Sequence, residues 1–326
     1  MKLGIFFEPM SQNAPADTYD LLLEQAITAE SLGFATAWIA GHEFPLAAAL
    51  AEVTEYIRVG VLAKPVLEHP LKAAEDGAVL DLASNGRLLF GIDPSIAPEE
   101  LDASGIPSDQ CWPRFIEATD VIVKSWTHDS FAYLGEYNRI PLRTNAVADD
   151  GQPFIAQAAE PPFVVPWRRA GMPFDYVSLQ PKPLQMPHPP VFVAAADLDS
   201  ARWAAHMGYS LLLGAGSAQP PASACAMAYW EELAKSGRRR DEVTLAIALE
   251  LEVFENNASA GQQPVSDAGL RLSGTPEQVL EGIKSIARDT GAFHVLCRIS
   301  AQHNDPTAVA RNLHLLASEV RPRLEM

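Results

Sequence analysis

The feature that most constrains this fold is a series of short apolar runs, each long enough for one strand. The first run, residues 3–7, precedes a segment with helical apolar spacing over 19–32, which Gly33 ends. Continuous apolar runs are typical of strands buried on both faces of a parallel sheet. Eight such strand and helix units predict a (β/α)8 TIM barrel. The predicted strands are 3–7, 36–40, 57–62, 88–92, 191–195, 209–213, 244–254 and 292–298.

An open, doubly wound sheet is the alternative architecture for such an alternating pattern. That fold would place a glycine-rich phosphate turn after the first strand. Here the sequence after the first strand is Phe7-Glu8-Pro9-Met10, without such a turn. At 326 residues the chain is also within the ordinary size of one barrel. We therefore predict a single domain over 1–326.

A proline-rich stretch interrupts the alternation before the fifth strand. Residues 141–190 hold eleven of the 26 prolines. Proline fixes φ and lacks a backbone donor, so this stretch cannot be mostly regular structure. We predict an insertion region over 128–190, with possible short strands at 131–137, 154–158 and 176–179.

Charge and composition exclude several classes of partner. The chain has 24 Lys and Arg against 41 Asp and Glu, a formal charge of −17. This balance disfavours nucleic acid and anionic membrane surfaces. No apolar run approaches the roughly 18 residues needed to span a bilayer. The three cysteines, Cys111, Cys225 and Cys297, form neither a disulfide framework nor a zinc pattern, so we expect a cytoplasmic protein with buried thiols.

Chemistry in such a barrel occurs at its mouth, the carboxyl ends of the strands. His42, directly after the second predicted strand, can act as an acid or base near neutral pH, or be an ordinary loop histidine. The histidines are scattered and predict no metal site. Asp197 and Asp199 suit helix capping better than phosphate binding. The side chains expected at the mouth are Glu8, His42, Glu43, Lys64, Asp93, Asp197, Gly214, Gly216, Glu255, Gln302 and His303.

One stretch is more specific. Residues 69–76 read HPLKAAED and residues 80–91 read LDLASNGRLLFG, with Asp81 and Arg87 placed to pair across a turn at Asn85-Gly86. This pattern resembles the signature of the bacterial luciferase-like family of flavin-dependent monooxygenases. Further matches occur at 29–34, 135–137, 181–190 and 274–277, so the resemblance covers nearly the whole chain.

The resemblance implies a two-component enzyme. Reduced FMN from a separate flavin reductase would react with oxygen to form a flavin C4a-peroxide, which oxidises a small organic substrate. The resemblance also implies association as a homodimer, or as a heterodimer with a related subunit. By the same resemblance, His42 acts near the flavin and Leu62-Ala63 forms a backbone bulge under its ring. Asp93 and Ser200 complete the predicted cofactor site.

Two departures keep other functions open. Pro94 stands where the family pattern has an arginine for the flavin phosphate, and Asp197 stands in a turn that usually carries serine. A carboxylate there would repel a phosphate. A non-catalytic accessory subunit is therefore one alternative, and a deazaflavin-dependent oxidoreductase, a class found in the same family, is another.

Overall fold

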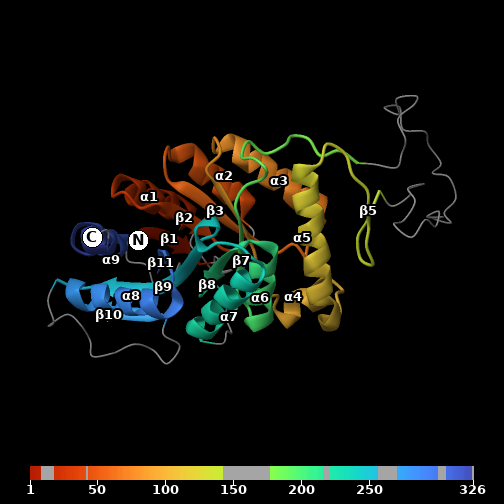
Figure 1. Ribbon diagram of the computed structural model, residues 1–326. Helices are drawn as coiled ribbons and strands as arrows, with labels where there is room; N and C mark the ends of the chain where they lie inside the picture. The colour runs from red at the N-terminus through yellow and green to blue at the C-terminus, as the bar shows by residue number, and fades with distance from the viewer. Residues whose placement is uncertain are drawn as a thin grey trace.

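The computed structural model describes residues 1–8, 18–41, 43–141, 177–215, 221–255, 270–299 and 306–324. Eight parallel strands close into a barrel, because β9 pairs with β8 on one side and with β11 on the other (Figure 1). The predicted fold class is confirmed. In ring order the strands are β1 (Lys2–Phe7), β2 (Thr36–Ile39), β3 (Arg58–Ala63), β4 (Leu88–Ile92), β7 (Val191–Ala194), β8 (Ser210–Leu213), β9 (Leu245–Val253) and β11 (His294–Ile299).

Helices surround the strands, and Gly33, at φ 79°, ends the first of them as expected. Among the described elements, the short helices α4 (Pro98–Ala103) and α10 (Arg321–Leu324) have no counterpart in the sequence prediction. The same is true of β10 (Arg271–Gly274), which pairs with β9 outside the ring. The helices are α1 (Thr18–Ser31), α2 (Phe44–Val53), α3 (Pro70–Ala83), α4 (Pro98–Ala103), α5 (Cys111–Thr127), α6 (Leu198–Met207), α7 (Ala222–Lys235), α8 (Pro276–Thr290), α9 (Pro306–Leu315) and α10 (Arg321–Leu324), with a π-helical turn at Leu316–Val320.

The barrel interior is filled by side chains rather than open. The indole of Trp38 is fully buried and packs edge-on against Phe192, with ring centroids 5.0 Å apart. It fits because its neighbours are glycines: a Cβ at Gly60 would lie 2.1 Å from the indole, and one at Gly91 would lie 2.9 Å from it. The interior cluster comprises Phe6, Trp38, Ala40, Leu62, Leu89, Phe192, Ala194, Leu212, Ala246, Ala248 and Leu296.

Polar side chains form hydrogen bonds that connect the segments at the base of the barrel, where the strands begin. Arg87 donates to the carbonyls of Ala51, Thr54 and Ile57 at the end of α2, and to that of Ser84. The predicted Asp81–Arg87 pair is therefore wrong. The Asp81 carboxylate instead accepts the backbone and side-chain N–H groups of Gln185, because the chain returns there about a hundred residues later.

The insertion region is described in part. Residues 142–176 of the predicted 128–190 stretch, including the expected strand at 154–158, lie outside the described residues. In the remainder, β5 (Tyr133–Leu134) and β6 (Arg139–Ile140) form a hairpin, and Phe131 bridges to Val177. The Glu117 carboxylate accepts the N–H groups of residues 136–138 and fixes this hairpin to α5.

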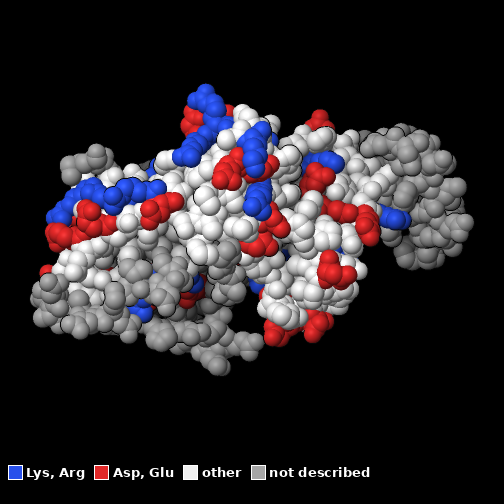
Figure 2. Space-filling model, turned by 60° about the horizontal axis from the view of Figure 1, so that its bottom comes forward, with Lys and Arg blue, Asp and Glu red and all other residues white. Residues whose placement is uncertain are grey.

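The surface and the thiols agree with the composition. On the face in Figure 2, most basic side chains lie beside acidic ones and form no separate basic patch. All three cysteines are free, with Cys225 and Cys297 buried. Among the described helices, none has the length and apolar character that a bilayer crossing requires.

Candidate functional site

A charged pair lies at the mouth of the barrel. Glu8 directly follows β1, and Arg298 lies on β11 in register with Phe6 of the interior cluster. The guanidinium donates from Nε and Nη2 to Glu8 Oε1 at 2.9 and 2.5 Å, and from Nη1 to the carbonyl of Gly214 at 3.0 Å. Each side chain is about one-quarter exposed, at 25% for Arg298 and 27% for Glu8. This contact joins the ends of β1, β11 and β8.

Part of the upper interior is apolar, while Glu250 and Glu252, which alternate along β9 with the inward-facing Ala246 and Ala248, pair with Arg271 of β10. Ala40, Leu62 and Ala194, at or near the ends of β2, β3 and β7, belong to the interior cluster. The predicted backbone bulge at Leu62-Ala63 is wrong: β3 stays in register with β4 through Ala63. The Leu62 side chain faces the interior, whereas Ala63 packs with the outer helices. The side chain that could contact a flat ring here is therefore Leu62.

Asp93 lies at the mouth but its carboxylate is engaged locally. Its side chain is buried and accepts the backbone N–H of Ser95 at 2.7 Å. Burial raises the pKa of the Asp93 carboxyl, an effect that the Ser95 hydrogen bonds and the positive charge of Lys64 oppose. Lys64 itself pairs with Glu100 of α4 at 2.6 Å. These groups stabilise the loop after β4, and the role of Asp93 in cofactor binding stays a prediction.

Ser200 is fully buried in the first turn of α6. Its hydroxyl accepts the N–H groups of Ala196 and Asp197, at 3.1 and 3.0 Å, and donates to the Asp197 carbonyl. Asp197 Oδ1 in return accepts the Ser200 N–H at 2.7 Å, which is a capping box. The expectation that Asp197 serves as a cap is confirmed. The cap thus engages the Ser200 hydroxyl and the N–H groups of Ala196, Asp197 and Ser200 at this turn.

His42 lies outside the described residues, as do Gly216, Gln302 and His303. Its predicted catalytic role is therefore untested by the geometry. Within the described ranges no group of three metal-ligating side chains occurs. Arg298 is one of the mouth residues that the sequence prediction missed, together with Glu250 and Glu252. The signal was present, since Arg298 ends the predicted strand 292–298 two residues after Leu296, on the same face.

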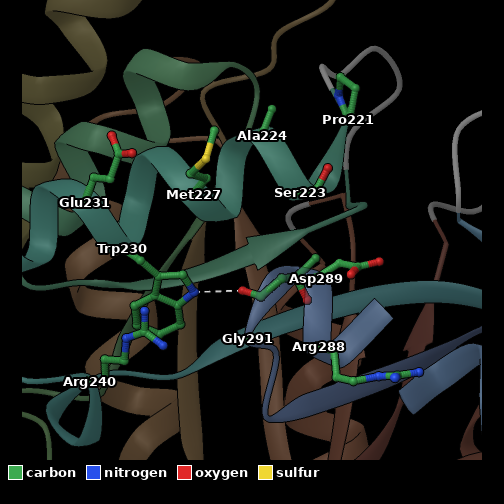
Figure 3. A pocket seen from close by; sticks show the side chains of 11 residues that line it. Pro221, Ser223, Ala224, Met227, Trp230, Glu231, Arg240, Arg288, Asp289 and Gly291 are labelled. Atoms are coloured by element: carbon green, nitrogen blue, oxygen red, sulfur yellow. Dashed lines mark hydrogen bonds between the residues drawn. The ribbon is translucent and has the colours of Figure 1, made fainter. Parts of the chain in front are cut away.

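A groove lies outside the barrel, between α7 and α8 (Figure 3). Trp230 forms its floor, donating from Nε1 to the Thr290 carbonyl at 2.7 Å, with Arg240 stacked 4.6 Å from the ring centre. Met227 and Glu231 line its rim. This groove is open and is built from helix surfaces rather than strand ends, so it does not compete with the mouth as a catalytic site.

The fold, the apolar interior and the mouth agree with one family of proteins. The chain belongs to the luciferase-like monooxygenase family, whose profile matches residues 1–264. Members of this family are TIM-barrel proteins, and the relatives below include enzymes that use flavin and enzymes that use F420, a deazaflavin.

Two curated relatives illustrate this range. The oxygenase component of a flavin-dependent trigonelline monooxygenase from Acinetobacter baylyi is 27% identical over 212 residues, which is 60% of this chain and 49% of the relative. An F420-dependent glucose-6-phosphate dehydrogenase from Amycolatopsis mediterranei is 30% identical over 138 residues, or 36% of this chain and 40% of the relative. The chain thus spans half or less of the length of these relatives.

Solved structures match over nearly the full chain. Monooxygenase RslO1 from Streptomyces bottropensis superposes with a TM-score of 0.79 at 22% identity, covering 99% of both chains. The oxygenating constituent of 3,6-diketocamphane monooxygenase from Pseudomonas putida, solved with FMN, gives a TM-score of 0.74 at 19% identity, covering 99% and 98%. At these identities the likeness establishes the fold alone.

Proposed function

We propose that this protein is the oxygenase component of a two-component flavin-dependent monooxygenase. It would receive reduced FMN from a separate reductase and oxidise a small organic substrate with molecular oxygen. The observation that carries the proposal is the apolar upper interior at Ala40, Leu62 and Ala194, within a chain of the luciferase-like family. Such surroundings suit an aromatic ring and limit water around it.

The described residues fit the two ends of FMN differently. The ring end fits, because Leu62 and the small side chains beside it offer an apolar surface. The phosphate end does not fit at α6, since the Ser200 hydroxyl is engaged in the cap and the Asp197 carboxylate beside it would repel a phosphate. The bound cofactor would supply the oxygen chemistry, while the chain would hold the ring and keep water out.

The first test measures flavin binding directly. Anaerobic titration with reduced FMN, followed by absorbance, should give saturable binding. Reduced riboflavin, which lacks the phosphate, should bind within about threefold of FMN, because a missing phosphate contact removes little affinity. An absence of saturable binding for both flavins would refute the proposal.

The second test concerns His42, whose catalytic role is part of the same proposal. With FMN, NADH and an added reductase, oxygen-dependent product formation from an accepted substrate should fall about a hundredfold in His42→Ala. His206→Ala is the matched control, because the exposed His206 side chain lies in the last turn of α6, at the base. Full turnover by His42→Ala would remove His42 from the mechanism.

The capping box at α6 favours a second candidate, an accessory luciferase-like subunit that has lost the phosphate site. This candidate predicts no flavin binding by the isolated chain, and activity when a related subunit is added. A deazaflavin-dependent oxidoreductase is distinguished by titration with F420 in place of FMN. Association with a second luciferase-like chain stays a prediction, which light scattering tests.

A further inference from the structure

The Glu8–Arg298 pair is the feature of the mouth that the proposed function leaves unused. It borders the interior cluster, which is apolar apart from the Trp38 indole N–H, with Phe6 in register beside Arg298. On the neighbouring strand β9, Glu250 and Glu252 add negative charge and pair with Arg271. Removing two charges largely from water is costly unless they are paired and hydrogen-bonded. Here they are, through two bonds to Glu8 and one to Gly214. An apolar pair of similar size would fill the same space without that cost.

We propose that Glu8 and Arg298 form the polar end of the substrate site and select neutral molecules with a carbonyl or hydroxyl oxygen over carboxylates. This inference rests on the proposed function in one respect, that the mouth of the barrel is where the substrate binds.

The position of the pair supports a substrate role over a cofactor role. The residues predicted to meet the flavin follow β2 and β4, end β3, or lie in the first turn of α6, which follows β7. Glu8 and Arg298 come from β1 and β11, and the Arg298 side chain extends over β9 to reach Gly214 after β8. The pair therefore lies on the side of the barrel mouth where no cofactor-binding residue is predicted.

The donors of Arg298 support recognition of an oxygen atom. A guanidinium has five N–H groups. The bonds to Glu8 and Gly214 use three of them, which leaves two that neither residue engages. A ligand oxygen that approaches Arg298 gains a charge-assisted hydrogen bond while its hydrocarbon part contacts the interior cluster.

Glu8 supports selection for neutral ligands. Its carboxylate shares the guanidinium, so the pair has no net charge. A ligand carboxylate on Arg298 would lie next to a like charge, which disfavours the anion. A neutral oxygen meets no such repulsion. Glu8 thus acts against anions while it holds Arg298 in place.

The test compares cyclohexanone with cyclohexanecarboxylate as probes on the full chain without flavin, using saturation-transfer NMR titrations. Wild-type protein should bind the ketone at least about tenfold more tightly than the carboxylate. Glu8→Gln should tighten carboxylate binding about tenfold and leave the ketone within threefold. Arg298→Gln should weaken the ketone about tenfold. Glu231→Gln, in the groove between α7 and α8, should leave both affinities unchanged.

The double variant Glu8→Gln/Arg298→Gln, which keeps the shape and removes both charges, should bind the two probes within about threefold of each other. Failure of wild type to bind the ketone, or an unchanged preference in the double variant, would overturn the inference. Circular dichroism melting confirms that each variant is folded. Because no flavin or turnover is involved, failure of the flavin titration refutes the proposed function without altering these affinities, and the two results can be separated.

Discussion

The charged groups at the base of the barrel and the Glu8–Arg298 pair at its mouth differ in what they bind. At the base, charged side chains bind backbone: Arg87 satisfies the end of α2, and Glu30 accepts the N–H groups of residues 55–57. At the mouth, Glu8 and Arg298 bind mainly each other and remain partly exposed. The comparison shows that Arg87, within the family motif, maintains the fold.

Replacement of Arg87 should produce the largest loss of stability. Arg87→Ala leaves the last carbonyls of α2 without their donors, so we expect a loss of about 3 kcal/mol or more in the free energy of unfolding. Urea denaturation followed by circular dichroism measures it. Arg298→Gln at the mouth is the control and should cost less, about 1 to 2 kcal/mol, because Glu8 and Arg298 remain about one-quarter exposed. Equal losses in the two variants would erase the distinction between base and mouth.

Substitutions in the interior layer between the base and the mouth should also lower the stability of the fold. In Gly60→Ala the new methyl group would lie 2.1 Å from the Trp38 indole, so we expect a loss of about 2 kcal/mol from overpacking. A smaller side chain in Trp38→Leu should relieve the clash. A double-mutant cycle should therefore show a coupling of at least about 1 kcal/mol between the two positions. Additive effects would mean that the strands shift to accept the methyl group.

The base should also show a pH response through His294. This side chain is buried, 3.1 Å from the Thr36 hydroxyl, and burial lowers its pKa to about 3. The unfolded chain binds a proton near pH 6.5 while the folded chain does not, so stability falls as the pH drops below 6.5. The slope should be about 1.4 kcal/mol per pH unit for this one proton. His294→Gln should reduce the acid slope between pH 6.5 and 5; an identical slope contradicts the assignment.

The smallest effect is expected at the cap of α6, on the mouth side. Ser200→Ala removes a hydroxyl that satisfies the turn, and should cost about 1 kcal/mol. The ratio of FMN to riboflavin affinity should stay unchanged. A selective loss of FMN binding would show instead that this hydroxyl contacts the phosphate, as the family resemblance implies.

The eight barrel strands could be predicted because each is a mainly apolar run between helical segments, although β9 contains two glutamates and β11 contains His294 and Arg298. The elements that were missed lack that signal: β10 is half polar, and α4 has six residues. The partner of Asp81 could not be found from local spacing, since Gln185 reaches it only after the chain has passed through the insertion region.

The candidate site was predicted less completely than the fold. Glu8 and Asp93 were expected at the mouth because they follow strands, and both lie there. The sequence could not show that the Ser200 hydroxyl is hydrogen-bonded within a helix cap. A cap and a phosphate contact both favour a serine at the start of a helix. Arg298 was hidden within a run that was treated as apolar throughout.

Two charged side chains bind the turn between α2 and β3. Arg87 donates hydrogen bonds to its carbonyls, and Glu30 accepts hydrogen bonds from its N–H groups. An added residue there would displace one set of partners or the other. We therefore expect the number of residues in this turn to be fixed among working barrels of this kind. Insertions and deletions would instead be found in segments that are not hydrogen-bonded from both sides. A peptide inserted at residues 54–57 should therefore destabilise the fold.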